Sequence, residues 1–536
     1  MISYQPIAIV GMGGVFPGAP DIASFWNNIV ARVDAIAEIP PHRWVVPPEH
    51  VYSRMFAVDK TFSKRAGTID INFDPTGFEI DSDLLVRLDP LYHYTLTAAR
   101  EALGRCAVSA VSRERAGVVL AAIALPTVGS AALANRIVGR AVARRLFDGQ
   151  AFGDPDVIDT ADLMAARVTS LPAVLLAKAF NFGGCAYTLD AACSSSLYAV
   201  KLACDDLQAG RADMMVAGGV SRPEVLYTQV GFTQLQALSK SGVCAPFDAR
   251  ADGLVVGEGA GLFVLKRLED AVADGDTILG VIRGIGLSND MEGNLLSPES
   301  EGQVRAMREA YRQAGWAVDD VGFIECHGTG TPVGDMVELS SMRELWNQTL
   351  WQAGQCPIGS IKSMIGHLLT GAGAAGMAKV LLGFANRTIP PGVNFSAPSA
   401  KSPLIKSPFR VQTEPEPWVP VKEGAPLRAA VSSFGFGGIN AHLLLEQWVP
   451  EEAPPPAGIT AVTRAVLSQP SPPPIAVVGM EACFGRAAGL RAFQEAVLRG
   501  DCLFEKPGPD RWKGLGDRVE EYLGHAPERG AFIDEV

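Results

Sequence analysis

Short apolar segments alternate with helical patterns along about 450 residues without a break, and this alternation limits the choice of fold more than any other feature. The strand-like segments include Ile7–Val10, Met214–Ala217, Phe323–Glu325 and His442–Leu445. The helical patterns include Ser170–Phe180, with Ser170 as N-cap and Pro172 in the first turn, and Glu301–Ala314. The alternation predicts an α/β protein.

Composition and charge exclude several classes of protein. The chain has 536 residues, of which 48% are hydrophobic and 19% charged, as expected for a globular protein with a large core. Its net charge of -12 argues against a general nucleic-acid binder, which needs clustered Lys and Arg. The nine cysteines include no CxxC pair, so neither a disulfide scaffold nor a structural zinc site is predicted, and no metal is expected.

The same features bear on location. Sparse cysteines fit a reducing compartment, and residues 1–6 lack a secretory signal, so a cytoplasmic location is expected. The uncharged stretch Ala116–Asn135 has membrane length, but its second half holds Pro126 and Gly129, and its first half resembles a buried strand. No membrane span is predicted.

A proline-rich segment divides the chain, and the sequence then begins again. Residues 450–474 contain 8 of the 37 prolines, which indicates a linker. Beyond it, Ile7–Met12 (IAIVGM) is echoed by Ile475–Met480 (IAVVGM), an offset of 468 residues. The echo continues with about ten identities over some forty positions, and after a four-residue deletion Arg65 matches Arg529.

This repeat predicts three parts. Residues 1–449 form one domain, residues 450–474 form the linker, and residues 475–536 form the N-terminal start of a second, truncated domain of the same fold. We therefore expect the sequence to be a piece of a longer multidomain protein.

Cys193 lies in a motif that fits a nucleophile. Residues 188–197 (TLDAACSSSL) place it among small side chains, just before a helical pattern that ends at Gly210. Small neighbours allow a sharp turn from strand to helix, and a helix N-terminus favours a thiolate. A buried cysteine alone is more often a small apolar residue, so the motif needs a partner elsewhere.

Two histidines lie in glycine-rich and polar loops after strand-like segments. Residues 325–335 (ECHGTGTPVGD) contain His327, and residues 359–367 (GSIKSMIGH) contain His367. A single histidine in either kind of loop more often has a structural role than a catalytic one. A cysteine with two distant histidines is a known arrangement for thioester chemistry.

Two further motifs are rich in glycine. Residues 431–442 (VSSFGFGGINAH) would let backbone N–H groups approach a ligand closely, or form an ordinary turn between strands. Residues 246–259 contain no clear catalytic pair and are expected to be architectural.

Taken in order, these five motifs resemble the β-ketoacyl synthase (ketosynthase) family of condensing enzymes, over roughly residues 5–448. The serine run after Cys193 and the alanine-rich segment after His367 are similar to ketosynthase domains of polyketide or polyunsaturated-fatty-acid multienzymes. The resemblance implies a thiolase fold, with two pseudo-symmetric halves in five layers (αβαβα), and a homodimer. It also implies an acyl carrier protein as partner, whose phosphopantetheine bears the substrates, and no cofactor in the domain itself.

By the same resemblance, Cys193 accepts an acyl chain as a thioester, and His327 and His367 assist decarboxylation of a malonyl-type extender. The resulting carbanion attacks the Cys193 thioester and gives a β-ketoacyl carrier protein. Backbone N–H groups of Cys193 and Phe436 match an oxyanion hole, and Phe434 matches a gate. The supporting residues that the resemblance implies are Lys362 and Glu338, as a lysine–carboxylate pair near the histidines, and Thr329 and Thr331, as hydroxyls that hold the pantetheine arm.

Two positions depart from the family pattern, and other functions remain open. Met364 stands where many members have asparagine and Ile439 where many have threonine, which predicts altered pocket polarity. The alternative is a non-elongating domain that binds or transfers acyl chains, or a dimerising scaffold. A thiolase is disfavoured because Phe434–Gly438 holds no second cysteine, and a coenzyme-A-primed synthase is disfavoured by the linker and repeat. Arginines at 136, 140, 144 and 145 are either a solvated helix face or a docking patch for an acidic carrier protein.

Overall fold

The computed structural model describes residues 5–104, 106, 113–134, 164, 171–292, 297–347, 349–450, 474–506, 508 and 529–533. The chain divides into two compact units, whose described residues lie at 5–450 and at 474–533. The arginines at 136, 140, 144 and 145 and most of the proline-rich segment lie outside the described residues, so the predictions made for them stay predictions.

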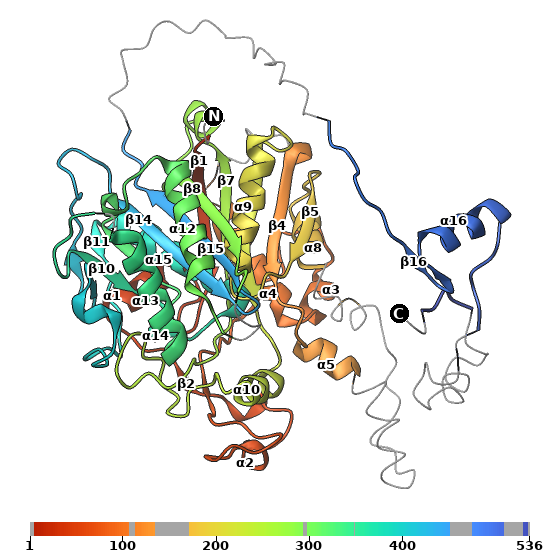
Figure 1. The fold of residues 1–536 in the computed structure, drawn as a ribbon, viewed down its shortest axis with the longest axis horizontal. Helices are drawn as coiled ribbons and strands as arrows, with labels where there is room; N and C mark the ends of the chain where they lie inside the picture. The colour runs from red at the N-terminus through yellow and green to blue at the C-terminus, as the bar shows by residue number, and fades with distance from the viewer. Residues whose placement is uncertain are drawn as a thin grey trace, which may run out of the picture. The chain divides into compact units, whose positions relative to one another are not determined.

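The first unit is built on an eleven-stranded mixed sheet (Figure 1). Its spatial order is β12 (Phe409–Val411), β10 (Cys356–Gly359), β9 (Phe323–Glu325), β14 (Arg428–Gly435), β15 (Ile439–Glu446), β8 (Gly280–Asn289), β1 (Ile7–Val15), β7 (Gly259–Arg267), β6 (Met214–Ser221), β4 (Ala116–Ala122), β5 (Ala186–Leu189). Two short pairs accompany it, β2 (Ala37–Glu38) with β3 (Arg65–Ala66), and β11 (Thr388–Ile389) with β13 (Glu416–Pro417).

The same succession of parallel and antiparallel strand pairings occurs twice in the sheet. From β5 through β4, β6 and β7 to β1, the successive pairs are parallel, parallel, antiparallel and antiparallel. From β10 through β9, β14 and β15 to β8 they follow the same sequence. Antiparallel pairing of β1 with β8 joins the two sets, and β12 adds an outer parallel strand to the second.

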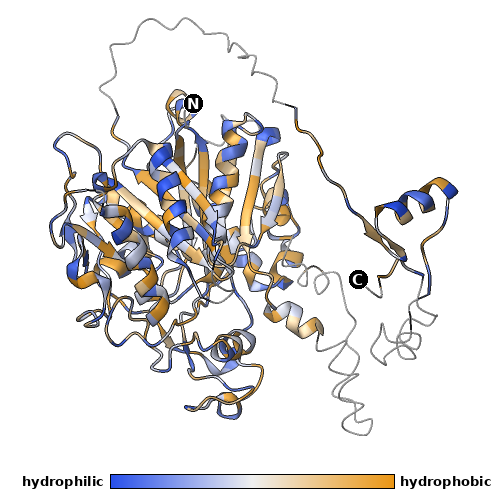
Figure 2. Ribbon diagram, viewed as in Figure 1, coloured by the Kyte–Doolittle hydropathy of each residue, from blue (hydrophilic) through white to orange (hydrophobic). Residues whose placement is uncertain are grey.

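Helices cover the sheet. They are α1 (Ile22–Val30), α2 (Pro48–Val51), α3 (Ser82–Arg87), α4 (Pro90–Leu103), α5 (Val128–Ala134), α8 (Leu171–Ala179), α9 (Ser195–Gln208), α10 (Val225–Gln234), α11 (Leu268–Ala273), α12 (Ser300–Ala314), α13 (Pro332–Trp346), α14 (Lys362–Ile365) and α15 (Ala372–Ala385). Helices α9 and α15 contact each other and share one core cluster with strands of both sets. Helix α4 packs on β1 and β7, while α12 packs on β8 and β15. The strands are largely hydrophobic in Figure 2, as burial beneath these helices requires.

The predicted α/β class is confirmed, and so are the predicted strands and helices, but Ser170, the predicted N-cap of α8, lies outside the described residues. The strand expected at Met214–Ala217 is the start of β6, and the strand at Phe323–Glu325 is β9. The helix expected after Cys193 ends at Gln208, two residues before Gly210, which has a positive φ of 65°. The rejected membrane segment contains the buried strand β4, and none of the described helices is both long and apolar enough to cross a membrane.

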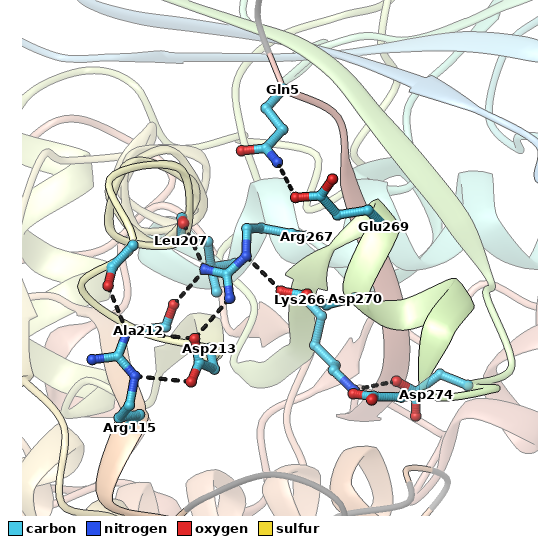
Figure 3. Close-up of polar contacts among 12 residues, drawn as sticks. Gln5, Arg115, Leu207, Ala212, Asp213, Lys266, Arg267, Glu269, Asp270 and Asp274 are labelled. Carbon is cyan, nitrogen blue, oxygen red and sulfur yellow. Dashed lines mark hydrogen bonds and ion pairs between the residues drawn. The ribbon is translucent and has the colours of Figure 1, made fainter. Parts of the chain in front are cut away.

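A charged network fixes the end of β7. The Arg267 guanidinium donates to the carbonyls of Leu207 and Ala212, both at 2.9 Å or less, and pairs with Asp213 and Asp270 (Figure 3). The network therefore ties β7 and α11 to the end of α9, the helix that begins just after Cys193.

The second unit repeats local geometry of the first. The rings of Phe16 and Phe25 lie 4.2 Å apart between centroids, and those of Phe484 and Phe493, at the 468-residue offset, lie 4.6 Å apart. The antiparallel bridge from Phe16 to Ala19 recurs where β16 (Cys483–Phe484) pairs with β17 (Ala487–Ala488), and α1 recurs as α16 (Leu490–Arg499). Beyond the four-residue deletion, the pairing of Ala37 with Ala66 recurs as a bridge between Glu505 and Gly530.

Candidate active site

The turn between β5 and α9 presents Cys193. Ala192, the residue before it, has a φ of 50°, which produces the sharp turn expected from its small neighbours. The Ser194 hydroxyl oxygen lies 2.7 Å from the carbonyl oxygens of both Ser433 and Ile439, which share its single hydrogen. The Ser433 hydroxyl donates in return to the Cys193 carbonyl at 2.6 Å. The serine run therefore attaches the cysteine to the glycine-rich turn between β14 and β15.

His367 contacts the cysteine directly. Its Nε2 lies 3.1 Å from the Sγ of Cys193. The backbone N–H of Leu369 donates to Nδ1 at 3.2 Å, and since Nδ1 is then the acceptor, the neutral ring carries its proton on Nε2. The His367 backbone is bonded on both sides to residues 255–257, which holds the ring in place.

His327 follows β9 and faces the same site. Its ring centroid lies 5.4 Å from that of His367 and 5.9 Å from that of Phe434. The buried carboxylate of Glu338, on α13, accepts the backbone N–H groups of His327 and Gly328 at 2.7 and 2.8 Å. Glu338 therefore fixes the loop that carries His327.

A cavity that opens to solvent connects these side chains. It is lined by Cys193, His327, His367, Thr329, Thr331, Phe434 and Phe436, all seven of which the motifs had singled out. Leu254, Pro298, Gln303, Gly334 and Gly435 also line it. Sequence reasoning missed Pro298 and Gln303 because they belong to none of the glycine-rich motifs.

The thiol of Cys193 is protonated at rest. Burial raises its pKa to about 11, although the positive charge of Lys362 and the backbone N–H groups of Phe436 and Cys193 act to lower it. The expectation that the helix N-terminus favours a thiolate is thus only partly met, since desolvation of the charged form outweighs the N–H groups. The N–H groups of Phe436 and Cys193 are the pair that the resemblance assigns to an oxyanion hole, and that assignment stays a prediction here.

Both histidines are neutral. Burial, with the nearby Lys362 charge, places the pKa of His327 and of His367 well below the usual value. Burial also lowers the pKa of Lys362, whereas Glu325 and Glu338 act to raise it. Neutral imidazoles with N–H groups can donate hydrogen bonds to an oxygen that gains negative charge.

The predicted pairing of Lys362 with Glu338 is electrostatic rather than a contact. Among the described residues these two form no ion pair, and the carboxylate of Glu338 binds backbone N–H groups instead. Lys379 and Glu325, by contrast, form a buried lysine–carboxylate contact at 2.7 Å. Glu325 also accepts the N–H of Ile361 at 2.6 Å, so this pair supports the segment that leads to Lys362.

Thr329 and Thr331 lie together at the cavity wall. Their hydroxyl oxygens are 2.9 Å apart, and Asp335 accepts the backbone N–H groups of Thr329 and Gly330.

Burial raises the pKa of Asp335 to about 6 and that of Glu338 to about 7. The described residues contain no group of three or more His, Cys, Asp or Glu side chains arranged to hold a metal ion.

The two departures from the family pattern lie outside the cavity lining. Met364 is buried in the central core cluster, and Ile439 offers its carbonyl to Ser194. Neither side chain is among the described residues that line the cavity, so the expected change in pocket polarity does not arise there.

The chain belongs to the β-ketoacyl synthase family. The family model for the N-terminal domain matches residues 4–271, the model for the C-terminal domain matches residues 279–396, and that for the C-terminal extension of ketoacyl synthetases matches residues 398–472. The last match extends across most of the segment predicted as a linker.

The chain is similar in sequence to short parts of much longer synthases. The chain is 35% identical to polyketide synthase PksL of Bacillus subtilis over 83% of its length, and 33% identical, also over 83%, to a polyunsaturated fatty acid synthase polypeptide of a Thraustochytrium species. It spans only 9% of the first relative and 16% of the second.

Solved ketosynthase structures are similar to this chain in fold and sequence. The chain is similar to the ketosynthase–chain length factor of PfaC, with a TM-score of 0.88 and 34% identity over 99% of this chain and 57% of that one. It is also similar to the ketosynthase from module 6 of the bacillaene synthase of Bacillus subtilis, with a TM-score of 0.69 and 33% identity over 83% of this chain and 73% of that one.

Proposed function

We propose that the first unit catalyses decarboxylative condensation of a Cys193-bound acyl chain with a malonyl-type carrier-protein thioester. The observation that carries the proposal is the 3.1 Å contact between His367 Nε2 and Cys193 Sγ, in a cavity shared with His327. The substrates would arrive on the phosphopantetheine of an acyl carrier protein, and no cofactor is proposed in the domain itself.

The first step is acyl transfer. The Cys193 sulfur attacks the thioester carbonyl of the acyl donor, the pantetheine thiol leaves, and the cysteine proton goes to that leaving thiolate. N–H groups of Cys193 and Phe436 stabilise the oxyanion of the tetrahedral intermediate, and Phe434 gates access to the sulfur. Removing one such donor typically costs on the order of 10²–10³ in rate.

The second step forms the carbon–carbon bond. The malonyl thioester loses CO₂, and His327 and His367 donate hydrogen bonds to the enolate oxygen that remains. The enolate carbon attacks the Cys193 thioester, and the β-ketoacyl chain leaves on the carrier protein. The released Cys193 thiolate then takes up a proton. Lys362, Glu338 and Glu325 position this site, and Thr329 and Thr331 hold the pantetheine arm.

Intact-protein mass spectrometry tests both steps. The protein is incubated with a panel of acyl-pantetheine thioesters, and malonyl carrier protein is added afterwards. We expect one acyl adduct, lost on addition of the extender as a β-ketoacyl carrier protein appears. The variant Cys193→Ala should form no adduct, whereas Cys326→Ala, which alters a buried cysteine next to His327, should behave as the parent protein.

The alternative function has its own outcome in this experiment. A stable adduct that survives malonyl carrier protein would indicate a domain that binds or transfers acyl chains without elongation. Absence of any adduct would indicate a scaffold. His327→Ala separates the steps, because it should retain acylation while condensation falls by on the order of 10²-fold or more.

We also propose the larger organisation. Residues 1–449 would form a five-layer thiolase fold, supported by the repeated pairing directions and by the paired helices α9 and α15. Residues 450–474 would be the linker, and residues 475–536 the start of a second ketosynthase-like domain, supported by the recurring Phe484–Phe493 pair. The similarity to a ketosynthase–chain length factor over 99% of the chain fits a tandem of this kind.

A homodimer is proposed at the β5 edge. Strand β5 ends the sheet, pairs only with β4 among the described strands, and exposes 36% of Tyr187. An open edge of this kind is commonly covered by another strand. Light scattering coupled to size-exclusion chromatography should give a molar mass of two chains for the parent protein. The variant Tyr187→Pro should give the mass of one chain.

A further inference from the structure

The cavity contains a polar group that the proposed reaction leaves without a role. Gln303, on α12, lines the cavity with Cys193 and is only 1% exposed. Its Oε1 has no hydrogen-bond partner among the described residues. A buried amide oxygen without a donor is costly, and because Gln303 lines the cavity, a ligand bound there can provide the donor.

Packing places Gln303 on the side of the threonines. Ser300, one helical turn earlier, bonds through its hydroxyl to Ser341 of α13 at 2.9 Å, so this face of α12 turns toward α13. Thr331 immediately precedes α13, and Gly334 lies in its first turn; both line the cavity with Gln303.

The donors and acceptors on that wall are complementary to amides. The hydroxyls of Thr329 and Thr331 bond to each other, so one hydroxyl hydrogen remains to donate outward. That hydrogen suits an amide carbonyl, whereas an amide N–H needs an acceptor such as the Gln303 Oε1. A pantetheine arm carries amides with both groups.

We infer that Gln303 is a substrate-positioning residue whose side-chain oxygen accepts an amide N–H of the pantetheine arm. The inference rests on the proposed function, because it concerns how the same cavity holds the thioester donor. The inference predicts that Gln303 recognises the pantetheine arm and not the acyl chain, because the N–H group that its oxygen would accept is on the arm.

The experiment compares two acyl donors, with and without amides, in the parent protein and in a variant. One acyl group is supplied either as its pantetheine thioester or as its propanethiol thioester, which has no amide, and the rate of Cys193 acylation is followed by intact mass. Gln303→Met keeps a similar volume and removes the acceptor. We expect it to slow acylation from the pantetheine thioester about tenfold and to change the rate from the propanethiol thioester less than about twofold.

A matched control is present in the chain. Gln229 is also 1% exposed with an unpartnered Oε1, but it is absent from the lining of the Cys193 cavity among the described residues. Gln229→Met should leave the ratio of the two rates unchanged. Calorimetric binding of acyl-pantetheine to Cys193→Ala gives a second readout, in which adding Gln303→Met should raise Kd about tenfold.

Other outcomes overturn the inference. An equal slowing with both donors would mean that Gln303 supports the fold or the acyl chain. Slowing that appears only when the acyl chain bears a hydroxyl would assign the oxygen to that group. If the parent protein forms no adduct with either donor, the proposed function fails, whereas loss of donor dependence alone overturns only the role of Gln303.

Discussion

Reactivity at Cys193 depends on two opposing local effects. Burial disfavours the thiolate, while the N–H groups of Phe436 and Cys193 favour it. The sulfur is therefore a weak nucleophile until a bound thioester changes its surroundings. His367 provides a hydrogen-bond donor at 3.1 Å, already oriented by Leu369.

This balance predicts the pH dependence of alkylation. Because the pKa of Cys193 is raised to about 11, the thiolate fraction and the rate with iodoacetamide should rise about tenfold per pH unit between about pH 7 and 9. The modified residue is identified by mass mapping, with Cys193→Ala as the blank. A rate that levels off below about pH 8 would contradict the prediction.

Seven residues that line the site could be predicted, whereas Gln303 and the pairing of the buried charges could not. Cys193, His327 and His367 lie in motifs whose composition indicates chemistry. Gln303 is one glutamine in an amphipathic helix, and nothing in its sequence context marks the orphaned oxygen. Lys379 likewise lies in an alanine-rich helical segment, and its contact with Glu325 depends on how α15 packs on β9.

At the scale of elements, that buried pair connects α15 to β9. The side chains of Lys379 and Glu325 are 0% and 2% exposed, and Lys379 also lies over the Phe323 ring. A charge left alone in such a place is far more costly than the pair, because it is desolvated without compensation.

Lys379→Met should therefore lower the free energy of unfolding of the first unit by about 3–5 kcal/mol. Adding Glu325→Gln should recover part of the loss, since the isolated charge is gone. Denaturant unfolding followed by tryptophan fluorescence measures both. The control is Arg308→Met, whose half-exposed pairing with Glu344 should be worth less than about 1 kcal/mol; equal effects of the two single substitutions would disprove the argument.

Strand and helix positions followed well from periodicity, but the sheet order did not. The sequence places β1 and β8 about 270 residues apart, and only the structure shows that they are neighbours at the centre. The pairing is decided by tertiary packing around α9 and α15, for which local patterns contain no signal.

At the scale of the whole molecule, the two units differ in how far their apolar segments are buried. In the first, Ile7 and Val10 of β1 are at most 1% exposed. In the second, Ile475, Val477 and Val478, in the segment equivalent to β1, are 85–97% exposed. An apolar strand-forming segment left open is a site of self-association.

Removing residues 451–536 should therefore reduce self-association and leave the first unit intact. We expect the melting temperature of the first unit to change by less than about 2 °C and Cys193 acylation to stay within about twofold. Scanning fluorimetry, intact mass and light scattering provide the three readouts. A drop of more than about 5 °C would show that the first unit depends on the removed segment.

The place of β1 has a consequence during synthesis. Its strand partners begin at Gly259 and Gly280, so β1, once it has left the ribosome, waits for residues made more than 240 positions later. At about 5–20 residues per second, that delay is on the order of 10–50 s. Throughout this interval β1 lacks its strand partners, so we expect a slow stretch of codons before residue 282 to favour misfolding more than one placed after it.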